Sequence, residues 1–323
     1  MRIACLPGDG IGPEVTVQAL RVLRELPVDA EVVELPFGGA AIDVAGEPLP
    51  PETLAACREA DAVLLGAVGG PRWQPGLAES GLLGLRRELD VYANLRPAGD
   101  LLVVRELVGG LYFGARGVRE DGTVFDTCEY HPRQVERVAR RAFELARARR
   151  GSLVSVDKAN VLDTSRLWRR VVTELAGQYP DVELRHALVD SFAIGIALQP
   201  ETLDVVLTEN MFGDILSDLA SGVAGGLGLA ASASLGDGGP GIFEPIHGSA
   251  PDIAGTGTAN PTAMLRSLAL LLEHAAGRVD LARAVEAAVD AALATTPTRD
   301  VGGDATTAEL GDAVLRSLEV AVG

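Results

Sequence analysis

Lysine is almost absent from this chain of 323 residues, because Lys158 is the one lysine among its 28 basic residues and the other 27 are arginines. Arginine suits a position that needs only a surface charge, and it does not lose its proton in a protein. A buried lysine, by contrast, can become neutral and act as a base. Lys158 is therefore a candidate catalytic base, and the chance survival of one lysine is the alternative interpretation.

Cysteine is also scarce, and Cys5, Cys57 and Cys128 lie far apart in the sequence. They can form neither a disulfide framework nor a Cys-x-x-Cys metal motif, so we interpret them as small buried side chains in a reducing cytosol. No apolar run reaches the length of about 18 residues that a membrane-spanning helix needs. The N-terminus reaches glycine too early for a signal peptide, so we expect a cytoplasmic protein.

Positive charge is in deficit, since 28 basic residues stand against 45 acidic residues and give a formal net charge of −17 at pH 7. Such a chain repels nucleic-acid phosphates and anionic lipid headgroups, so neither nucleic acid nor a membrane is an expected partner. An anionic small substrate would need a local basic cluster that works against the overall field. Hydrophobic residues make up 47% of the chain, which predicts a packed globular interior.

Short apolar runs alternate with segments of helical periodicity. The predicted strands are residues 2–7, 31–35, 62–65, 101–104, 111–113, 153–156, 182–188 and 203–207. The predicted helices are residues 13–26, 51–59, 82–89, 132–149, 164–175, 192–198 and 214–220. A further helix is expected with Asn260 as its N-cap and Pro261 at its first position. This alternation predicts an α/β fold with a largely parallel sheet.

A glycine cluster at residues 8–13, Gly-Asp-Gly-Ile-Gly-Pro, follows the first predicted strand. It is similar to the fingerprint of dinucleotide-binding folds, but its spacing is Gly-x-Gly-x-Gly and Pro13 occupies the place of the third glycine. We favour a tight strand-to-helix turn near a ligand, and a true Rossmann motif is the alternative.

Asp214 and Asp218 are four residues apart and would share one face of a helix, where like charges cost about 0.2–0.5 kcal/mol. Most of the residues around them are apolar, so this is not a generic solvated face. A hard divalent cation would neutralise the pair and use its oxygens, whereas an exposed acidic stripe is the alternative. Asp190, where a predicted strand meets a helix, is a plausible third ligand.

Several other residues are candidates for ligand contacts. The arginines near the ends of predicted elements are Arg86, Arg87, Arg96 and Arg105. They suit bidentate capture of a dicarboxylate, although each one alone could be a surface residue. The glycine-rich segment 244–255 could approach a ligand closely or be only a loop. Tyr112 could donate a proton or simply cap a core.

Taken together, these segments resemble the isocitrate/isopropylmalate dehydrogenase family of β-decarboxylating enzymes over nearly the whole chain. The resemblance is carried by residues 6–14, 92–97, 104–107, 109–114, 155–161, 210–221 and 247–260. It implies the two-domain α/β fold of that family and not a Rossmann fold. Residues 1–91 plus 226–323 would form the NAD-contacting domain, and residues 92–225 the domain that carries dimerisation, metal and catalytic residues.

The resemblance also implies a role for each matching residue. Tyr112 and Lys158 would be the acid–base pair, and Asp190, Asp214 and Asp218 would bind Mg²⁺ or Mn²⁺. Substrate contacts would come from Arg86, Arg96, Arg105, Asp190, Leu82, Leu83 and Val161. NAD contacts would come from Gly66, Glu79, His247, Gly248, Ser249, Ala250, Pro251, Asp252, Ile253 and Asn260. Lys158 and Asp190 would reach the site from a partner subunit, which implies a homodimer with shared active sites.

The implied activity is the NAD-dependent oxidative decarboxylation of 3-isopropylmalate to 2-oxoisocaproate (4-methyl-2-oxopentanoate) in leucine biosynthesis. Leu82 and Leu83 match a pattern in which two leucines form a pocket for the isopropyl group. Homoisocitrate, D-malate and tartrate are alternative substrates, and a weakly active paralogue that only binds a nucleotide or a metal is an alternative of another class. One departure concerns residues 97–104, because family members usually carry a longer segment with a helix between the equivalents of Arg96 and Arg105.

Overall fold

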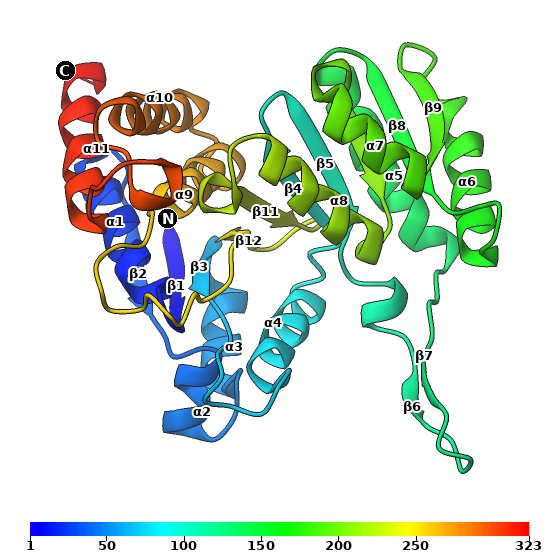
Figure 1. The fold of residues 1–323 in the computed structure, drawn as a ribbon, viewed down its shortest axis with the longest axis horizontal. Helices are drawn as coiled ribbons and strands as arrows, with labels where there is room; N and C mark the ends of the chain where they lie inside the picture. The colour runs from blue at the N-terminus through cyan, green and yellow to red at the C-terminus, as the bar shows by residue number, and fades with distance from the viewer. Residues whose placement is uncertain (323) are drawn as a thin grey trace. The chain divides into compact units, whose positions relative to one another are not determined.

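Strands and helices alternate along the chain, which confirms the predicted α/β class (Figure 1). The computed structural model describes residues 1–322. The chain forms two units, residues 1–90 with 225–323 and residues 91–224. We call them unit 1 and unit 2. Gly323, the last residue of the predicted first domain, lies outside the described residues.

Unit 1 is built on a mostly parallel set of strands. They are β1 (Arg2–Gly8), β2 (Glu31–Glu34), β3 (Ala62–Ala67), β11 (Ala231–Leu235) and β12 (Gly241–Pro245), in the spatial order β2-β1-β3-β12-β11. The helices are α1 (Gly12–Glu25), α2 (Gly39–Ala45), α3 (Pro51–Glu59), α4 (Leu77–Glu88), α9 (Thr262–His274), α10 (Val279–Thr295) and α11 (Thr307–Val322). Only β11 and β12 pair antiparallel among these strands. Every residue of β3 is buried, as expected for a parallel strand covered on both faces.

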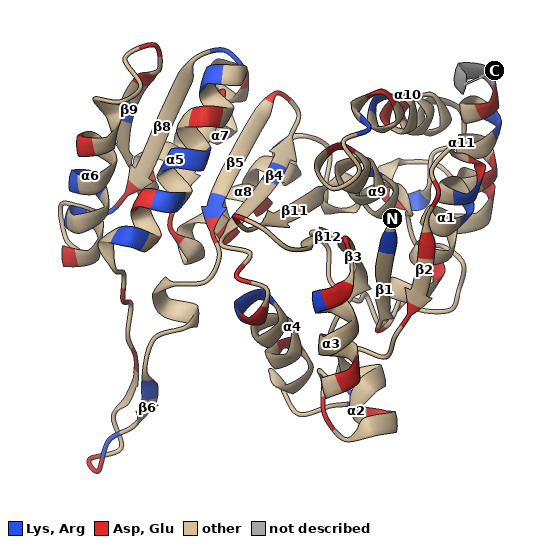
Figure 2. Cartoon of the chain, turned by 180° about the vertical axis from the view of Figure 1, so that it is seen from behind, with Lys and Arg blue, Asp and Glu red and all other residues tan. Residues whose placement is uncertain are grey.

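Unit 2 repeats this architecture in a second set of strands. They are β4 (Ala93–Ala98), β5 (Leu101–Glu106), β10 (Val205–Thr208), β8 (Ser152–Asp157) and β9 (Glu183–Leu188), in that spatial order. The helices are α5 (Pro132–Ala148), α6 (Asp163–Ala176), α7 (Val189–Leu198) and α8 (Asn210–Val223). One core cluster joins Val103, Val154 and Val206 of the strands to Leu216 of α8. Figure 2 shows basic and acidic residues along the outer side of α5, whose buried positions include Val138.

A small hairpin of β6 (Arg116–Val118) and β7 (Val124–Asp126) extends away from the rest of unit 2 (Figure 1). The two strands pair antiparallel, with Val118 opposite Val124. Both valines are exposed, at 70% and 71%. This hairpin was not predicted from the sequence, because its strands are too short to show an alternating pattern.

Three local predictions require correction. Residues 110–112 form the 3-10 helix η1 (Gly110–Tyr112) rather than a strand, because Gly110 has φ +71° and turns the chain back. The N-cap of α9 is Pro261, one residue later than predicted, although Asn260 Oδ1 still accepts a hydrogen bond from Thr262 N at 2.9 Å. Helix α4 begins at Leu77, five residues before the predicted start at Leu82. Within residues 1–322, no helix combines the length and the apolar character needed to cross a membrane.

Candidate active site

The predicted carboxylate pair lies on α8, beside two predicted arginines. Arg96 Nη1 lies 3.3 Å from Asp214 Oδ1 and 3.2 Å from Asp218 Oδ1. Arg105 Nη1 lies 2.5 Å from Asp214 Oδ1. Only 7% of the Arg96 side chain and 2% of the Arg105 side chain are exposed, so the cationic side of these ion pairs is shielded from water. The structure therefore brings four predicted site residues together.

The pairing of β4 with β5 explains why the two arginines meet. Arg105 stands opposite Asn94, and Arg96 stands opposite Val103. Because side chains alternate between the faces of a sheet, Arg96 shares a face with Asn94 and therefore with Arg105. Asn94 Oδ1 accepts a hydrogen bond of 2.7 Å from Arg96 Nε. The short segment between the arginines is thus a tight hairpin turn, in which Gly99 has φ +58°, and the β4–β5 ladder holds both arginines in register.

Tyr112 contacts the same carboxylate from η1. Its Oη donates a hydrogen bond of 2.9 Å to Asp214 Oδ2, and the Arg105 guanidinium lies 5.7 Å from the centre of its ring. Burial, and then the negative charge of Asp214, raise the pKa of Tyr112 to about 12. Tyr112 therefore keeps its proton at neutral pH and is able to donate it. We call Arg96, Arg105, Tyr112, Asp214 and Asp218 the Asp214 cluster.

The two carboxylates of this cluster face two guanidiniums. Figure 2 shows acidic and basic residues meeting where β5 ends beside α8. Burial raises the pKa of Asp218, and this effect outweighs the opposing positive charge of Arg96. The negative charge of Asp214 acts in the same direction as burial. A nearby cation stabilises the charged form of such half-buried, mutually repelling carboxylates. Carboxylate oxygens are also the ligands that hard divalent ions prefer.

A further tier of buried polar residues lies behind the Asp214 cluster, and the sequence reasoning missed it. Arg105 Nε and Nη2 donate to Asn210 Oδ1 at 3.1 and 2.8 Å. Asn210 N donates to Tyr130 Oη at 3.0 Å. Tyr130 Oη lies 3.1 Å from Glu106 Oε2 and 3.4 Å from Glu209 Oε2. Glu106 is the last residue of β5, and Glu209 follows the neighbouring strand β10. A polar residue at the end of each of two adjacent parallel strands was the signal that could have revealed this tier.

Lys158 follows β8 and pairs with Asp190 in the first turn of α7. Its Nζ donates a hydrogen bond of 2.7 Å to Asp190 Oδ1. The exposed fractions of the two side chains are 25% and 65%. The hydrogen bond and charge of Lys158 lower the pKa of Asp190. Val161, in the turn after Lys158, is 61% exposed. We call Lys158 and Asp190 the Lys158 pair.

The third predicted metal ligand does not join the other two within one chain. Among residues 1–322, no group of three or more His, Cys, Asp or Glu side chains is arranged to hold a metal ion. Asp190 has Lys158 as its partner, whereas Asp214 is bound by Arg96 and Arg105. One copy of the chain therefore presents two carboxylates on α8 and a separate lysine–aspartate pair.

In unit 1, the predicted substrate arginine Arg86 lies on α4 and contacts β12. Its Nη2 lies 2.8 Å from Glu244 Oε1, and only about a tenth of either side chain is exposed. Arg86 Nε is buried without a hydrogen-bond partner. Leu82 and Leu83 are half-buried on the preceding turn of the same helix. Because residues three and four apart share a helix face, both leucines neighbour Arg86.

The predicted NAD loop packs on the glycine cluster of residues 8–12. Ile11 N donates to Ser249 O at 2.9 Å. Gly10 has φ +58°, and a Cβ at this position would come within 2.0 Å of Ser249 O. Gly10 therefore allows two backbone segments to approach each other closely, as expected for the predicted tight turn. Within this loop Ala250 also has a positive φ, of +40°, while Gly248, Pro251, Asp252 and Ile253 are exposed.

His247 offers an unpaired buried nitrogen beside this loop. Its Nδ1 lies 2.9 Å from Gly248 O, and because a carbonyl oxygen only accepts, Nδ1 carries the proton. Its Nε2 is buried without a partner. Burial lowers the pKa of His247, which keeps the ring neutral and Nε2 an acceptor. An amino group of a bound base would satisfy this nitrogen.

The remaining predicted NAD contacts have packing roles in the free chain. A Cβ at Gly66 would come within 2.4 Å of Pro7 O, so glycine lets β3 lie against the end of β1. Glu79 is exposed on α4, with its Oε1 over Gly69. Asn260 Nδ2 donates to Asp300 Oδ2 at 3.0 Å. Of these three residues, Glu79 has a side chain that is open to solvent and therefore accessible to a ligand.

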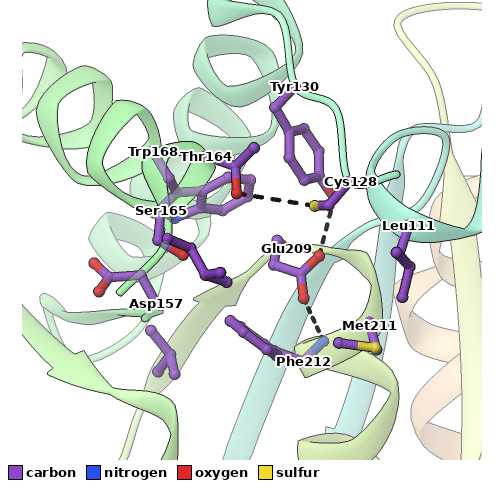
Figure 3. Close-up of a pocket in the computed structure, with 12 residues that line it drawn as sticks. Leu111, Cys128, Tyr130, Asp157, Thr164, Ser165, Trp168, Glu209, Met211 and Phe212 are labelled. Carbon is purple, nitrogen blue, oxygen red and sulfur yellow. Dashed lines mark hydrogen bonds between the residues drawn. The ribbon is translucent and has the colours of Figure 1, made fainter. Parts of the chain in front are cut away.

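Unit 2 contains a cavity of about 210 Å³ (Figure 3), whose lining includes Leu111 and Asp157, the chain neighbours of Tyr112 and Lys158, but not those two predicted catalytic residues. It is bounded by Trp168 and Thr164 of α6, by Cys128 and Tyr130, and by Glu209 at the start of α8. Its walls are almost entirely apolar. Burial raises the pKa of the Cys128 thiol, so this cysteine is not an activated nucleophile.

Comparison with known proteins yields matches over nearly the whole chain. A family model described as isocitrate/isopropylmalate dehydrogenase matches residues 2–99 and 98–314. The chain is 48% identical to the 3-isopropylmalate dehydrogenase of Zymomonas mobilis, over 98% of this chain and 100% of that protein. It is 50% identical to the enzyme of the same name from Deinococcus radiodurans, over 98% and 97%.

Solved structures give the same result. The isocitrate dehydrogenase of Methylococcus capsulatus has a TM-score of 0.93 and 37% identity, over 98% of this chain and 99% of that one. A β-decarboxylating dehydrogenase of Thermococcus kodakarensis has a TM-score of 0.85 and 41% identity, over 99% and 96%. The two stretches that match the family model meet at residues 98–99, where β4 turns into β5. This is the place where the sequence indicates a shortened segment.

Proposed function

The chain belongs to the isocitrate/isopropylmalate dehydrogenase family, and from this premise we propose that it catalyses the NAD-dependent oxidative decarboxylation of 3-isopropylmalate in leucine biosynthesis. The observation that carries the reaction class is the Asp214 cluster, in which buried guanidiniums, carboxylates and a protonated tyrosine meet. The names of the relatives from Zymomonas mobilis and Deinococcus radiodurans support the substrate.

Arg96 and Arg105 bind the carboxylates of the diacid in this proposal. Both guanidiniums are buried and held by Asn94 and Asn210, so they are oriented before substrate arrives. A guanidinium binds a carboxylate through two parallel hydrogen bonds, which gives direction as well as charge. This local positive charge offsets the net charge of −17 that would otherwise repel an anion.

Asp214 and Asp218 fit a hard divalent ion, because two carboxylates lie on one helix face and burial disfavours the charge of Asp218. A third ligand would be Asp190 of a second copy, since one chain does not gather three such residues within its described part. When bound, Mg²⁺ or Mn²⁺ would supply a Lewis acid for the oxygen on C2, and NAD⁺ would supply the acceptor for the hydride of C2. Asp214 and Asp218, which pair with Arg96 and Arg105 in this structure, are the residues of this chain that would hold the ion.

Lys158 and Tyr112 move the protons in this proposal. Lys158 of a partner subunit takes the proton of the C2 hydroxyl, a role that arginine cannot fill because it does not lose its own proton. Loss of CO₂ from C3 leaves the electron pair of the broken C–C bond in an enolate, and Tyr112 gives its proton to C3 of that enolate to form the 2-oxo acid. The raised pKa of Tyr112, about 12, keeps that proton available at neutral pH.

A homodimer with shared sites follows from these roles. Large apolar side chains on the outer faces of α7 and α8 support it, since Ile194 and Leu198 are 61% and 72% exposed and Ile215 is 60% exposed. Helix α7 carries Asp190 of the Lys158 pair in its first turn, and α8 carries Asp214 and Asp218 of the Asp214 cluster. A second copy packed on them would cover the apolar faces and bring Lys158 to a neighbouring site.

The loop at residues 247–260 receives NAD in this proposal. The acceptor Nε2 of His247 suits the amino group of adenine. Asp252 is exposed on the same loop, where its charge would repel the additional phosphate of NADP. Leu82 and Leu83 would line the pocket for the isopropyl group beside Arg86.

The decisive experiment measures NADH formation from 3-isopropylmalate with Mg²⁺, with and without EDTA, and compares homoisocitrate, D-malate and tartrate. We expect the highest kcat/KM with 3-isopropylmalate, a loss of activity with EDTA and weak activity with NADP. A higher kcat/KM with another of these diacids would identify that diacid as the substrate in place of 3-isopropylmalate. Binding of NAD without NADH formation from any of these acids would indicate a paralogue that has lost catalysis.

A further inference from the structure

Glu106, the last residue of β5, is fully buried, and no proposed catalytic role uses it. Its Oε1 accepts a hydrogen bond of 3.0 Å from Val108 N, and its Oε2 accepts one of 2.9 Å from Gly109 N. One carboxylate therefore binds two successive amides of the segment that leads from β5 into η1. A buried carboxylate is costly, so its retention here calls for a reason beyond packing.

Gly109 is held from its other side as well. Asn210 Nδ2 donates a hydrogen bond of 2.9 Å to Gly109 O. Tyr130 packs against this point, because a Cβ at Gly109 would come within 2.7 Å of Tyr130 Cε1. The N–H and the C=O of Gly109 are thus both bound by buried side chains that come from β5 and α8.

This clamp lies immediately before the proposed proton donor. Gly110, with φ +71°, starts η1, and Tyr112 ends it. The Oη of Tyr112 reaches Asp214 on α8, the helix whose first residue is Asn210. Helix α8 therefore contacts both ends of this segment, because Asn210 binds Gly109 and Asp214 binds Tyr112. The position of Glu106 sets where η1 begins and hence where the hydroxyl of Tyr112 points.

We propose that Glu106 is a positioning residue, whose carboxylate holds Val108 and Gly109 so that Tyr112 is placed to protonate the reaction intermediate. The inference rests on the proposed function for its catalytic consequence. Glu106 touches neither substrate nor cofactor, and it acts through Tyr112. A residue that only stabilises the fold would affect every catalytic constant through the amount of folded protein, whereas a positioning residue changes kcat per folded molecule.

The test is Glu106→Gln, which keeps the size of the side chain but turns one acceptor into an N–H donor that faces a backbone N–H. We expect kcat to fall roughly tenfold to a hundredfold, as a displaced catalytic group predicts. The KM for 3-isopropylmalate and the Kd for NAD should change less than about twofold, because Arg105 keeps its bonds to Asn210.

A double-mutant cycle with Tyr112→Phe separates positioning from folding. If Glu106 acts through Tyr112, Glu106→Gln in the Tyr112→Phe background lowers the residual kcat less than about twofold, because the group it positions is gone. An equal loss of kcat in both backgrounds overturns the proposal. So does an unchanged kcat in the single variant.

The matched control is Asp204→Asn, which changes another buried carboxylate of unit 2 that also binds a backbone amide, Arg150 N. Asp204 precedes β10, whereas Glu209 and Asn210 follow that strand, so it lies at the far end of the sheet from Tyr112. We expect lower stability and unchanged kcat from this variant. If Asp204→Asn lowered kcat as much as Glu106→Gln does, the loss would not be specific to Glu106 and the proposal would be overturned.

Hydrogen exchange tests the hydrogen bonds of Glu106 without an activity measurement, and the measurement on the parent protein needs no variant. In the parent protein the amides of Val108 and Gly109 should exchange slowly although they lie between regular elements, and Glu106→Gln should speed exchange over residues 107–113. Rapid exchange of both amides in the parent protein overturns the proposal. If the parent forms no NADH from any diacid while these amides are protected, the proposed function fails and the clamp stands.

Discussion

The Asp214 cluster and the Lys158 pair carry the same kinds of charge but in opposite surroundings. The guanidiniums of the cluster are buried, cross-linked by Asn94 and Asn210, and held on one sheet face. Lys158 and Asp190 instead form one ion pair open to solvent. In terms of the proposed function, the difference means that one copy of the chain already orients the arginines proposed to bind the diacid, whereas the proposed base Lys158 lies in a separate and more exposed ion pair. A side chain held by a single exposed partner remains free to serve another site.

The largest expected effect on activity comes from the exposed pair. Lys158→Arg keeps the positive charge and the ion pair with Asp190 but removes the base, so we expect kcat to fall roughly 10²- to 10⁴-fold. Far-ultraviolet circular dichroism and the urea midpoint should match those of the parent protein, because the pair is exposed. Retention of full activity would remove Lys158 from the mechanism.

The largest expected effect on stability comes from the buried cluster. Arg105→Leu removes the ion pair with Asp214, which keeps Arg96, and both hydrogen bonds to the buried Asn210 Oδ1, so we expect the free energy of unfolding to fall by about 2–4 kcal/mol. Activity should be lost along with it. Asp190→Asn is the matched variant in the exposed pair, and its urea midpoint should equal that of the parent. Equal destabilisation by both variants would contradict the contrast between the two regions.

A pH effect on stability should arise from Glu106. Burial raises the pKa of Glu106 from the ordinary 4.5 to about 7, although the hydrogen bonds from Val108, Tyr130 and Gly109 oppose this shift, so the ionised carboxylate that these bonds hold costs stability relative to the protonated form. The contribution to stability is therefore complete below about pH 4.5 and is lost as the pH rises through about 7. Relative to Glu106→Gln, the parent should lose about 1–3 kcal/mol of unfolding free energy between pH 5 and pH 8. Urea titrations of both proteins at the two pH values measure this difference, and parallel curves would contradict it.

The smallest expected effect concerns the shortened hairpin. Insertion of four residues, Gly-Ser-Gly-Ser, between Gly99 and Asp100 lengthens a surface turn, and the added loop should cost less than about 1 kcal/mol. The insertion lies outside the β4–β5 ladder, which pairs Arg96 with Val103 and should persist. We expect kcat/KM within about twofold of the parent. A strong loss of substrate binding would show that the short turn itself sets the spacing of the arginines.

Several candidate site residues could be predicted from the sequence because their signals are local. The spacing of Asp214 and Asp218 on one helix face and the isolation of Lys158 among arginines need no tertiary information. Glu106 gave no such signal, because a charged residue at the end of an apolar run is ordinary in a strand. The 3-10 helix that carries Tyr112 was misread as a strand, since one glycine with a positive φ outweighed the apolar run around it.

The amino-acid sequence by itself determined the alternation of strands and helices, the family, and the residue types of the candidate site. These follow from periodicities and motifs that span a few neighbouring positions. Only the tertiary structure decided that Arg96 and Arg105 share a face, that Asn210 binds Arg105, and that the Asp214 cluster and the Lys158 pair are separate within one copy. Those facts depend on strand register and helix placement, which bring together residues more than 100 positions apart, such as Arg105 and Asp214, and no local pattern encodes them.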